Sequence, residues 1–204
     1  MEENHCWHCG SAAEMSLFCR FCNSLQQPVP DYYRFFGFEK KFTLDPAELE
    51  RRFYSLSRQL HPDLFFRAMP REREYSLEAT AILNDAYRTL RDPVLRAEYL
   101  LKELGEQPGD RDREAVPPEL LEEVFEVNEL LEESRAGQRP TPQLQDVHRK
   151  FLALRQEADR ELEELYRRHD ATGDRAVLRD IRGVLSRRRY LHNLIQQIEK
   201  ELAP

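Results

Sequence analysis

Four cysteines occur in the 204-residue chain, and all of them lie between residues 6 and 22. They form two CxxC pairs, Cys6 with Cys9 and Cys19 with Cys22. Each pair can place two thiolates on one metal ion, and two pairs complete a tetrahedral four-thiolate site of the kind that zinc prefers. A segment this short buries too little apolar surface to fold alone, so the metal would supply its folding free energy. The spacing therefore predicts a small zinc-binding knuckle module over residues 1–30 that holds one structural zinc ion.

The same thiols allow other chemistry. Four thiolates can also hold an iron–sulfur cluster, and the two pairs could act separately as redox pairs or form disulfides. A thioredoxin-type redox pair needs a βαβ context, which the sequence does not provide. His5 and His8 could each replace a thiolate as a ligand. With four protein ligands no coordination position stays open for a substrate, so a structural role is favoured over catalysis.

The second set of residues that could carry chemistry is the tripeptide His61-Pro62-Asp63. A helix is predicted to run into it, because Asp45 and Pro46 are typical of a helix start. Pro62 cannot continue a helix, so this helix should stop with a histidine and an aspartate at its tip. The apolar residues of the helix recur at spacings of four, three and four and share one face: Leu49, Phe53, Leu56 and Leu60.

A further amphipathic helix is predicted over residues 76–91, and shorter helices over residues 32–38 and 95–104. The two long helices would lie antiparallel, with the tripeptide in the loop between them. This arrangement resembles a J-domain, and the segments Asp31-Tyr32-Tyr33 and Asn84 to Pro93 support the resemblance. The resemblance implies a four-helix J-domain over residues 31–105.

The resemblance also implies a protein partner. In J-domains the basic second helix meets an acidic surface on the nucleotide-binding domain of a DnaK-type heat-shock ATPase, and the tripeptide then stimulates ATP hydrolysis by that partner. The alternatives are a turn in which Asp63 only caps and a helix face whose arginines are only solvated. The residues implied in the chaperone contact are His61, Pro62, Asp63, Arg51, Arg52 and Arg58.

Composition and missing motifs limit the function classes. The sequence has no GxxxxGK phosphate loop and no nucleophile elbow, and His61 has no evident partner to orient it as a general base, so we expect no enzyme. The formal charge of −7 argues against a nucleic-acid binder. No apolar run approaches the ~20 residues of a membrane span. The acidic start, Met1-Glu2-Glu3-Asn4, lacks the features of a signal or transit peptide.

Three more amphipathic helices are predicted beyond residue 116. The first opens at Pro117-Pro118 and runs to about residue 134, the second ends near residue 169, and the third covers residues 175–202. Their apolar residues recur at helical spacing, and the connections contain glycine and proline. These features predict a three-helix bundle over residues 116–204. The fold class of the whole chain is therefore mainly α.

Some apolar residues in this region lie off the predicted core stripes. Leu121 and Phe125 are one turn apart and well away from the core face of their helix, and Tyr190 and Leu194 form a similar pair on the last helix. Large exposed apolar groups are informative when they cluster, because they typically mark a partner surface. The alternatives are that they face the J-like domain or are exposed singly without a function.

The order of the three parts narrows the resemblance. A four-cysteine module, a J-domain and an acidic three-helix bundle resemble the mitochondrial iron–sulfur cluster co-chaperones of the HscB/Jac type, in their vertebrate form. The run from Leu120 to Glu129 is similar to the segment where that family binds its cluster scaffold. The residues implied in scaffold binding are Leu121, Phe125 and Tyr190, with Glu122 and Glu129 in support, and Leu194 joins them by its place one turn from Tyr190.

The resemblance implies a co-chaperone with two protein partners. One is a mitochondrial DnaK-type chaperone, and the other is the IscU-type scaffold that carries a nascent 2Fe–2S cluster. Cluster acceptor proteins would be further partners, and nucleic acids and membranes would not. A location in the mitochondrial matrix follows from the resemblance alone, with the cytoplasm as a second compartment. The other interpretations are a J-domain co-chaperone with a different client, and a zinc or redox factor in which residues 1–30 act.

Overall fold

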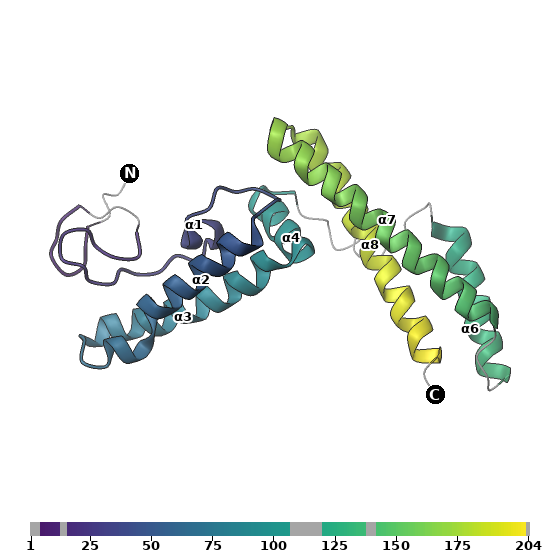
Figure 1. Cartoon of the computed structure of the whole chain (residues 1–204), viewed down its shortest axis with the longest axis horizontal. Coiled ribbons are helices and arrows are strands. Elements are labelled where there is room, and N and C mark those ends of the chain that lie inside the picture. The colour runs from purple at the N-terminus through teal and green to yellow at the C-terminus, as the bar shows by residue number, and fades with distance from the viewer. Residues whose placement is uncertain (1–4, 13–15, 107–119, 138–141, 203–204) are drawn as a thin grey trace. The chain divides into compact units, whose positions relative to one another are not determined.

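The computed structural model describes residues 5–12, 16–106, 120–137 and 142–202. Within them the chain is mainly helical, as the sequence predicted (Figure 1). It divides into two compact units, residues 1–99 and 100–204. None of the described helices has the length and apolarity needed to cross a membrane. The helices are α1 (Tyr32–Phe36), α2 (Pro46–Leu60), the short 3-10 helix η1 (Pro62–Phe65), α3 (Pro70–Arg91), α4 (Pro93–Glu103), α6 (Leu121–Gly137), α7 (Pro142–Thr172) and α8 (Arg175–Leu202).

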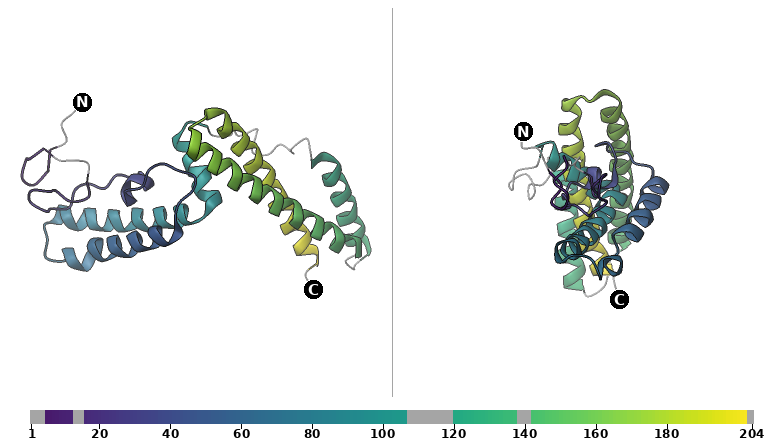
Figure 2. Two further views of the ribbon diagram at one scale, coloured as in Figure 1. Left: turned by 45° about the horizontal axis from the view of Figure 1, so that its top comes forward. Right: turned by 90° about the vertical axis from the view of Figure 1, so that its left-hand side faces the viewer.

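In the first unit, α2 and α3 form the expected antiparallel hairpin (Figure 2). Phe53 of α2 stacks on Tyr87 of α3 with ring centres 4.1 Å apart. Leu49 and Leu60 of α2 and Leu83 of α3 are almost fully buried. The apolar stripe read from the sequence is therefore the face that α2 turns toward the core, because burying it removes apolar surface from water.

Three helix boundaries in this unit differ from the sequence-based expectation, and the smallest change is that α4 begins at Pro93 rather than Leu95. α1 ends earlier than expected because Gly37, with a φ of 71°, takes the left-handed conformation that closes a helix. α3 begins at Pro70 rather than Ser76. Proline suits the first helical turn, where its missing N–H would have had no helical partner. The earlier start gives α3 additional turns at its N-terminal end.

The cysteine module packs against these additional turns of α3. The backbone N–H of Leu25 donates to Oε1 of Glu72 at 3.1 Å. The Trp7 ring lies edge-on to Tyr75 with centres 6.3 Å apart, and the guanidinium of Arg71 lies 5.3 Å from the Trp7 ring. The module and the helices thus belong to one compact unit. A division into separate domains at residue 30 stays a prediction.

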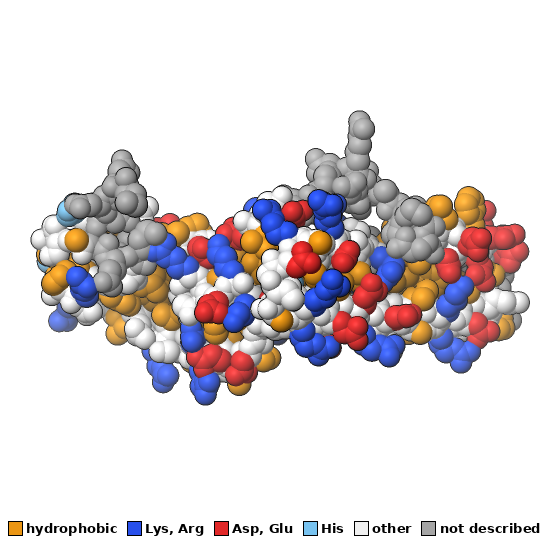
Figure 3. All heavy atoms as spheres, turned by 90° about the horizontal axis from the view of Figure 1, so that it is seen from above, with side chains coloured by type: hydrophobic (Ala, Val, Ile, Leu, Met, Phe, Trp, Pro, Cys, Tyr) orange, Lys and Arg blue, Asp and Glu red, His pale blue; other side chains and the backbone are white. Residues whose placement is uncertain are grey.

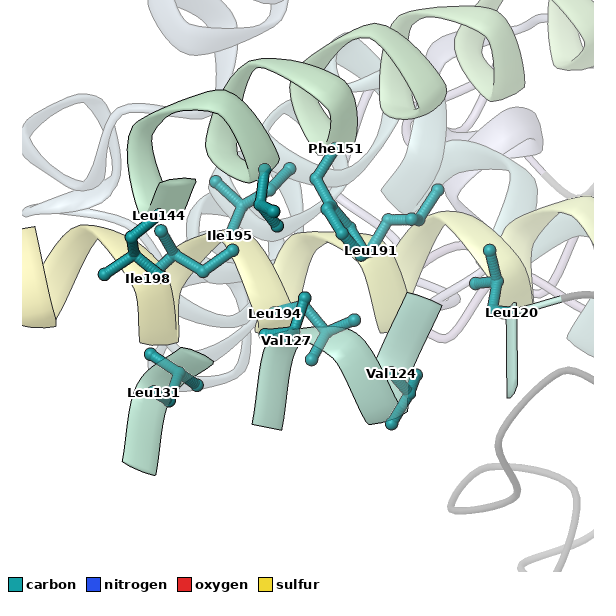
Figure 4. Packing of buried hydrophobic residues seen from close by; sticks show 11 residues of the cluster. Leu120, Val124, Val127, Leu131, Leu144, Phe151, Leu191, Leu194, Ile195 and Ile198 are labelled. Carbon is teal, nitrogen blue, oxygen red and sulfur yellow. The ribbon is translucent and has the colours of Figure 1, made fainter. Parts of the chain in front are cut away.

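In the second unit, α6, α7 and α8 pack together as the expected three-helix bundle. α7 continues to Thr172, past its predicted end, and Gly173 turns the chain with a φ of 65°. The predicted opening at Pro117-Pro118 lies outside the described residues. Eleven buried residues form the core that joins the three helices (Figure 4): Leu120, Val124, Val127, Leu131, Leu144, Val147, Phe151, Leu191, Leu194, Ile195 and Ile198.

The sequence-based placement of Leu194 off the core is wrong. Only 4% of this residue is exposed, and its side chain points from α8 toward α6 within the cluster (Figure 4). Each helix of a three-helix bundle buries two faces, one against each neighbour, so the buried stripe of α8 is wider than the face against α7. Tyr190 is half-buried and packs against the same cluster, so it also lies closer to the core than expected.

Candidate functional site

The four cysteine sulfurs come together in one cluster. All four Sγ atoms lie within 4.8 Å of one another, with Cys6 and Cys22 3.7 Å apart and Cys9 and Cys19 3.8 Å apart. Tetrahedral zinc with Zn–S bonds of about 2.3 Å would separate its sulfur ligands by about 3.8 Å. A disulfide would need about 2.05 Å, and all four cysteines are free thiols. The geometry therefore fits a metal site with four sulfur ligands.

The cluster is built from two knuckles of the same design. In each, the residue after the second cysteine donates its N–H to the carbonyl of the first: Gly10 to Cys6 at 2.9 Å and Asn23 to Cys19 at 2.8 Å. Both donors take the left-handed conformation, with φ of 70° and 58°. Glycine adopts it without steric cost, and asparagine is among the residues that tolerate it best. The residue that follows each CxxC thus allows the turn that brings two sulfurs onto one centre.

The surroundings of the thiols favour thiolates at some positions. Burial opposes ionisation, but backbone N–H groups, that of Cys9 first, outweigh it and lower the pKa of the Cys6 thiol to about 5. The Ser24 hydroxyl lowers the pKa of Cys22. Backbone N–H groups act the same way on Cys19, yet burial and the neighbouring thiols leave its pKa raised. A bound cation would favour the thiolate form at all four cysteines, since metals bind the deprotonated form of cysteine.

The tripeptide forms the exposed tip of the first unit. The side chains of His61 and Asp63 are both exposed, and Nδ1 of His61 accepts the Asp63 N–H at 3.3 Å. Directly before them, the carbonyl of Leu60 accepts hydrogen bonds from the hydroxyls of Ser76 at 2.7 Å and Thr80 at 3.2 Å. Sequence reasoning missed these two α3 residues. The sequence did contain one signal for them, because Ser76 lies on the apolar face of the predicted helix, where a polar residue needs a hydrogen-bond partner.

The three arginines that were grouped by resemblance differ in their contacts. Arg51 and Arg58 are exposed, and Arg51 pairs with Glu48 of the preceding turn. Arg52 also bonds Glu48, at 2.7 Å, and donates to two carbonyls at the end of α1, at 2.8 and 2.6 Å. Its guanidinium lies 4.2 Å from the centre of the Phe38 ring. Arg52 therefore holds α2 against the end of α1, whereas Arg51 and Arg58 face solvent.

Two large apolar side chains next to the tripeptide were also missed by the sequence reasoning. Leu64 lies in η1, and Phe66 is the first residue after η1; both side chains are strongly exposed. Large exposed apolar groups beside a polar tip are characteristic of a surface that a partner covers. Their spacing of two residues carries no helical periodicity, which is why the sequence pattern did not single them out.

The residues of α6 that were predicted to bind the scaffold have exposed side chains. Leu121 is 45% exposed and Phe125 is 75% exposed, and Glu122 and Glu129 are exposed on the same helix. Glu129 lines an acidic hollow of about 490 Å³ between α6 and α7 with three further carboxylates. Figure 3 shows acidic and apolar side chains gathered over the part of the second unit that contains α6. Tyr190 lies half-buried on α8, so its exposed part is smaller than that of the α6 pair.

Comparison with known proteins covers both units. Residues 116–199 match a family model described as the HSCB C-terminal oligomerisation domain. The fold matches the crystal structure of human co-chaperone protein HscB with a TM-score of 0.76 and 27% sequence identity, over 97% of this chain and 98% of that structure. The chain belongs to the HscB family. A chaperone HscB from Vibrio cholerae matches with a TM-score of 0.62 and 28% identity, over 83% of this chain and 95% of that structure.

Two HscB relatives carry names that state a role. The Arabidopsis thaliana iron–sulfur cluster co-chaperone protein HscB homolog is 38% identical over 132 residues, which are 63% of this chain and 51% of that relative. The human iron–sulfur cluster co-chaperone protein HscB is 28% identical over 205 residues, which are 98% of this chain and 83% of that relative. The match thus spans about half the length of the Arabidopsis HscB homolog and most of the human HscB.

Proposed function

We propose that this HscB-family chain is a non-enzymatic co-chaperone for iron–sulfur cluster biogenesis. It binds an IscU-type scaffold, delivers it to a DnaK-type chaperone of the mitochondrial matrix and stimulates ATP hydrolysis by that chaperone, which promotes cluster transfer to acceptor proteins. The observation that carries this proposal is the presence of two exposed sites of different chemistry on two separate units. The names of the human and Arabidopsis relatives support the same role.

The chaperone contact is assigned to residues 31–105 as a J-domain. His61, Pro62 and Asp63 act as the trigger at the tip of α2, and Arg51 and Arg58 attract an acidic partner surface. The exposure of His61, Asp63 and the two arginines supports this assignment, since a contact residue must reach the partner. Arg52 contributes indirectly, by fixing α2 to the end of α1.

The scaffold contact is assigned to residues 116–204. Leu121 and Phe125 are its apolar centre, because binding energy concentrates in a few large side chains that become desolvated. Glu122 and Glu129 form its acidic rim, and Tyr190 adds its exposed edge. The burial of apolar residues beneath the pair supports the assignment, because a rigid helix presents both side chains without first having to be ordered.

The cysteine module, over residues 1–30, is assigned one structural zinc ion. Cys6, Cys9, Cys19 and Cys22 would hold it, and the ion would hold the two knuckles together.

The zinc assignment can be tested on the purified protein. Metal analysis of the purified chain should give one zinc per chain. The chain contains a single tryptophan, Trp7, which lies between two of the cysteines. Removal of the metal by a chelator should therefore shift the fluorescence emission of Trp7 to longer wavelength, while the helical circular dichroism signal persists. If the emission of Trp7 does not change when the chelator is added, a structural metal is rejected.

The main test is single-turnover ATP hydrolysis by a mitochondrial DnaK-type chaperone with this protein added, with and without purified scaffold. The expected result is stimulation that rises further when scaffold is present, because both sites then act in one complex. Stimulation that does not respond to scaffold would assign the chain to a different client. No stimulation would leave the tripeptide as an ordinary turn.

A further inference from the structure

At the end of α2, the backbone carbonyl of Leu60 lacks its helical partner. In a continuing helix the Leu60 carbonyl would accept from the N–H of Leu64. Pro62 ends the helix, and the Leu64 N–H donates instead to the carbonyl of His61 at 3.0 Å. Leu60 is fully buried, and a buried backbone group that stays unpaired costs free energy. The carbonyl therefore needs a partner from another part of the protein.

α3 supplies that partner twice. The hydroxyl of Ser76 donates to the Leu60 carbonyl at 2.7 Å and that of Thr80, one turn later on the same face, at 3.2 Å. Ser76 has no exposed surface, and its neighbours on this face, Ala79 and Leu83, are buried and apolar. A hydroxyl in such surroundings costs free energy unless it is hydrogen-bonded. The serine is therefore placed for this bond and not for contact with solvent.

We infer that Ser76 and Thr80 are positioning residues for the His61-Pro62-Asp63 tripeptide, an inference that rests on the proposed stimulation of a DnaK-type ATPase. The carbonyl they hold belongs to the residue directly before His61. Its position fixes the point and the direction in which the chain leaves α2. His61 and Asp63 are exposed, so the geometry of the tripeptide depends on this anchor to the core.

The anchor explains how a small exposed turn can present a fixed geometry to a partner. A helix end frays when its last carbonyls are paired only with water. Two hydroxyls from a neighbouring helix restrict this fraying, because they hold the last carbonyl of α2 from a second element. The effect should appear in the local dynamics of the turn before it appears in the overall stability of the chain.

The test uses full-length variants that remove one hydroxyl at a time. Ser76→Ala deletes the stronger anchor without adding volume. Thr80→Val deletes the weaker anchor and keeps the shape of the side chain, and Thr80→Ser keeps the hydroxyl. Thr89→Val is the matched control, the same change near the other end of α3. Each variant is titrated into single-turnover ATP hydrolysis, and amide hydrogen exchange is measured across residues 61–66.

Ser76→Ala should raise the concentration for half-maximal stimulation about fivefold to tenfold, the range set by loss of one buried hydrogen bond. Exchange at the amides of Leu64 and Phe66 should become faster in parallel. Thr80→Val should show the same changes at smaller size. Thr80→Ser and Thr89→Val should match the wild type, and scaffold affinity should stay constant throughout.

The inference is overturned if folded Ser76→Ala shows wild-type exchange in the turn, or if exchange accelerates while stimulation is unchanged. If Ser76→Ala does not fold, the same two measurements are compared between Thr80→Val and Thr80→Ser, and their difference decides the inference. If the wild-type chain does not stimulate the ATPase, the proposed function fails. The exchange comparison then still tests the anchor, since it needs no partner.

Discussion

The tip of α2 and the outer face of α6 present their side chains by different means. At the tip, three consecutive residues leave a helix end, and the anchor that holds them comes from α3, sixteen residues away or more. On α6, Leu121 and Phe125 project from a regular helix whose opposite face is buried in the three-helix core. The tip therefore depends on distant hydrogen bonds and the α6 face on its own core stripe. Substitutions should separate the two dependences.

The largest effect is expected at the tip. His61→Gln should reduce ATPase stimulation to the basal rate, because the proposed trigger depends on the geometry and chemistry of one small turn. Scaffold affinity should remain at the wild-type value, because α6 belongs to the other unit. Single-turnover hydrolysis and a direct scaffold-binding titration measure the two effects. Loss of both activities together would contradict the separation of the two sites.

The next effect concerns the core beneath the α6 face. Leu194→Ala should destabilise the second unit by about 3 kcal/mol, a typical value for a buried leucine truncated in a packed core. The matched control is Leu121→Ala, the same substitution on the surface, which should stay within about 0.5 kcal/mol. Denaturant unfolding followed by circular dichroism compares the two. Equal destabilisation would mean that Leu121 also belongs to the core.

A smaller effect is expected when the α6 pair is removed. Leu121→Ala with Phe125→Ala should weaken scaffold binding about 30-fold, or about 2 kcal/mol, because the proposed function places the pair at the centre of the contact. Stimulation measured without scaffold should not change. Calorimetric titration of the scaffold gives the affinity, and an unchanged value would reject the α6 face as the binding site.

The tip offers a pair of the same composition for comparison. Leu64→Ala with Phe66→Ala also removes one exposed leucine and one exposed phenylalanine. This variant should raise the concentration needed for half-maximal ATPase stimulation and leave scaffold affinity unchanged. If both pairs weakened scaffold binding, exposed apolar area alone would explain the binding, and the specific α6 site would be unnecessary.

The smallest effect is expected for the exposed arginines. Arg58→Ala should weaken stimulation about threefold at low salt and less at physiological salt, because exposed charges are screened.

The half-buried Arg52 should behave differently from Arg58. Arg52→Ala should lower the thermal stability of the first unit, since Arg52 bonds the end of α1 and stacks on Phe38. Thermal melts and salt-dependent hydrolysis distinguish the two. An Arg52 variant of normal stability would contradict its role as a clamp.

Local patterns in the sequence predicted most of the helices, because periodicity and proline positions act within a few residues. The cysteine spacing likewise predicted the cluster of sulfurs, since each CxxC closes its own knuckle. Two of the failures concern partners that are distant in sequence. Leu194 is buried by α6, and Ser76 serves a carbonyl of α2. A helical wheel for one helix cannot show which second face a neighbouring helix will cover.

The pairing of Arg51 with Glu48 has a consequence for how the chain meets an acidic partner. Because an internal carboxylate already occupies this guanidinium, a partner carboxylate must compete for it. Association at this position is then an exchange of one ion pair for another, and the attraction that Arg51 offers is reduced by the exposed pair it gives up, about 0–1 kcal/mol. Such an exchange favours brief encounters over long residence. In the proposed co-chaperone role, brief encounters would allow repeated rounds of hydrolysis.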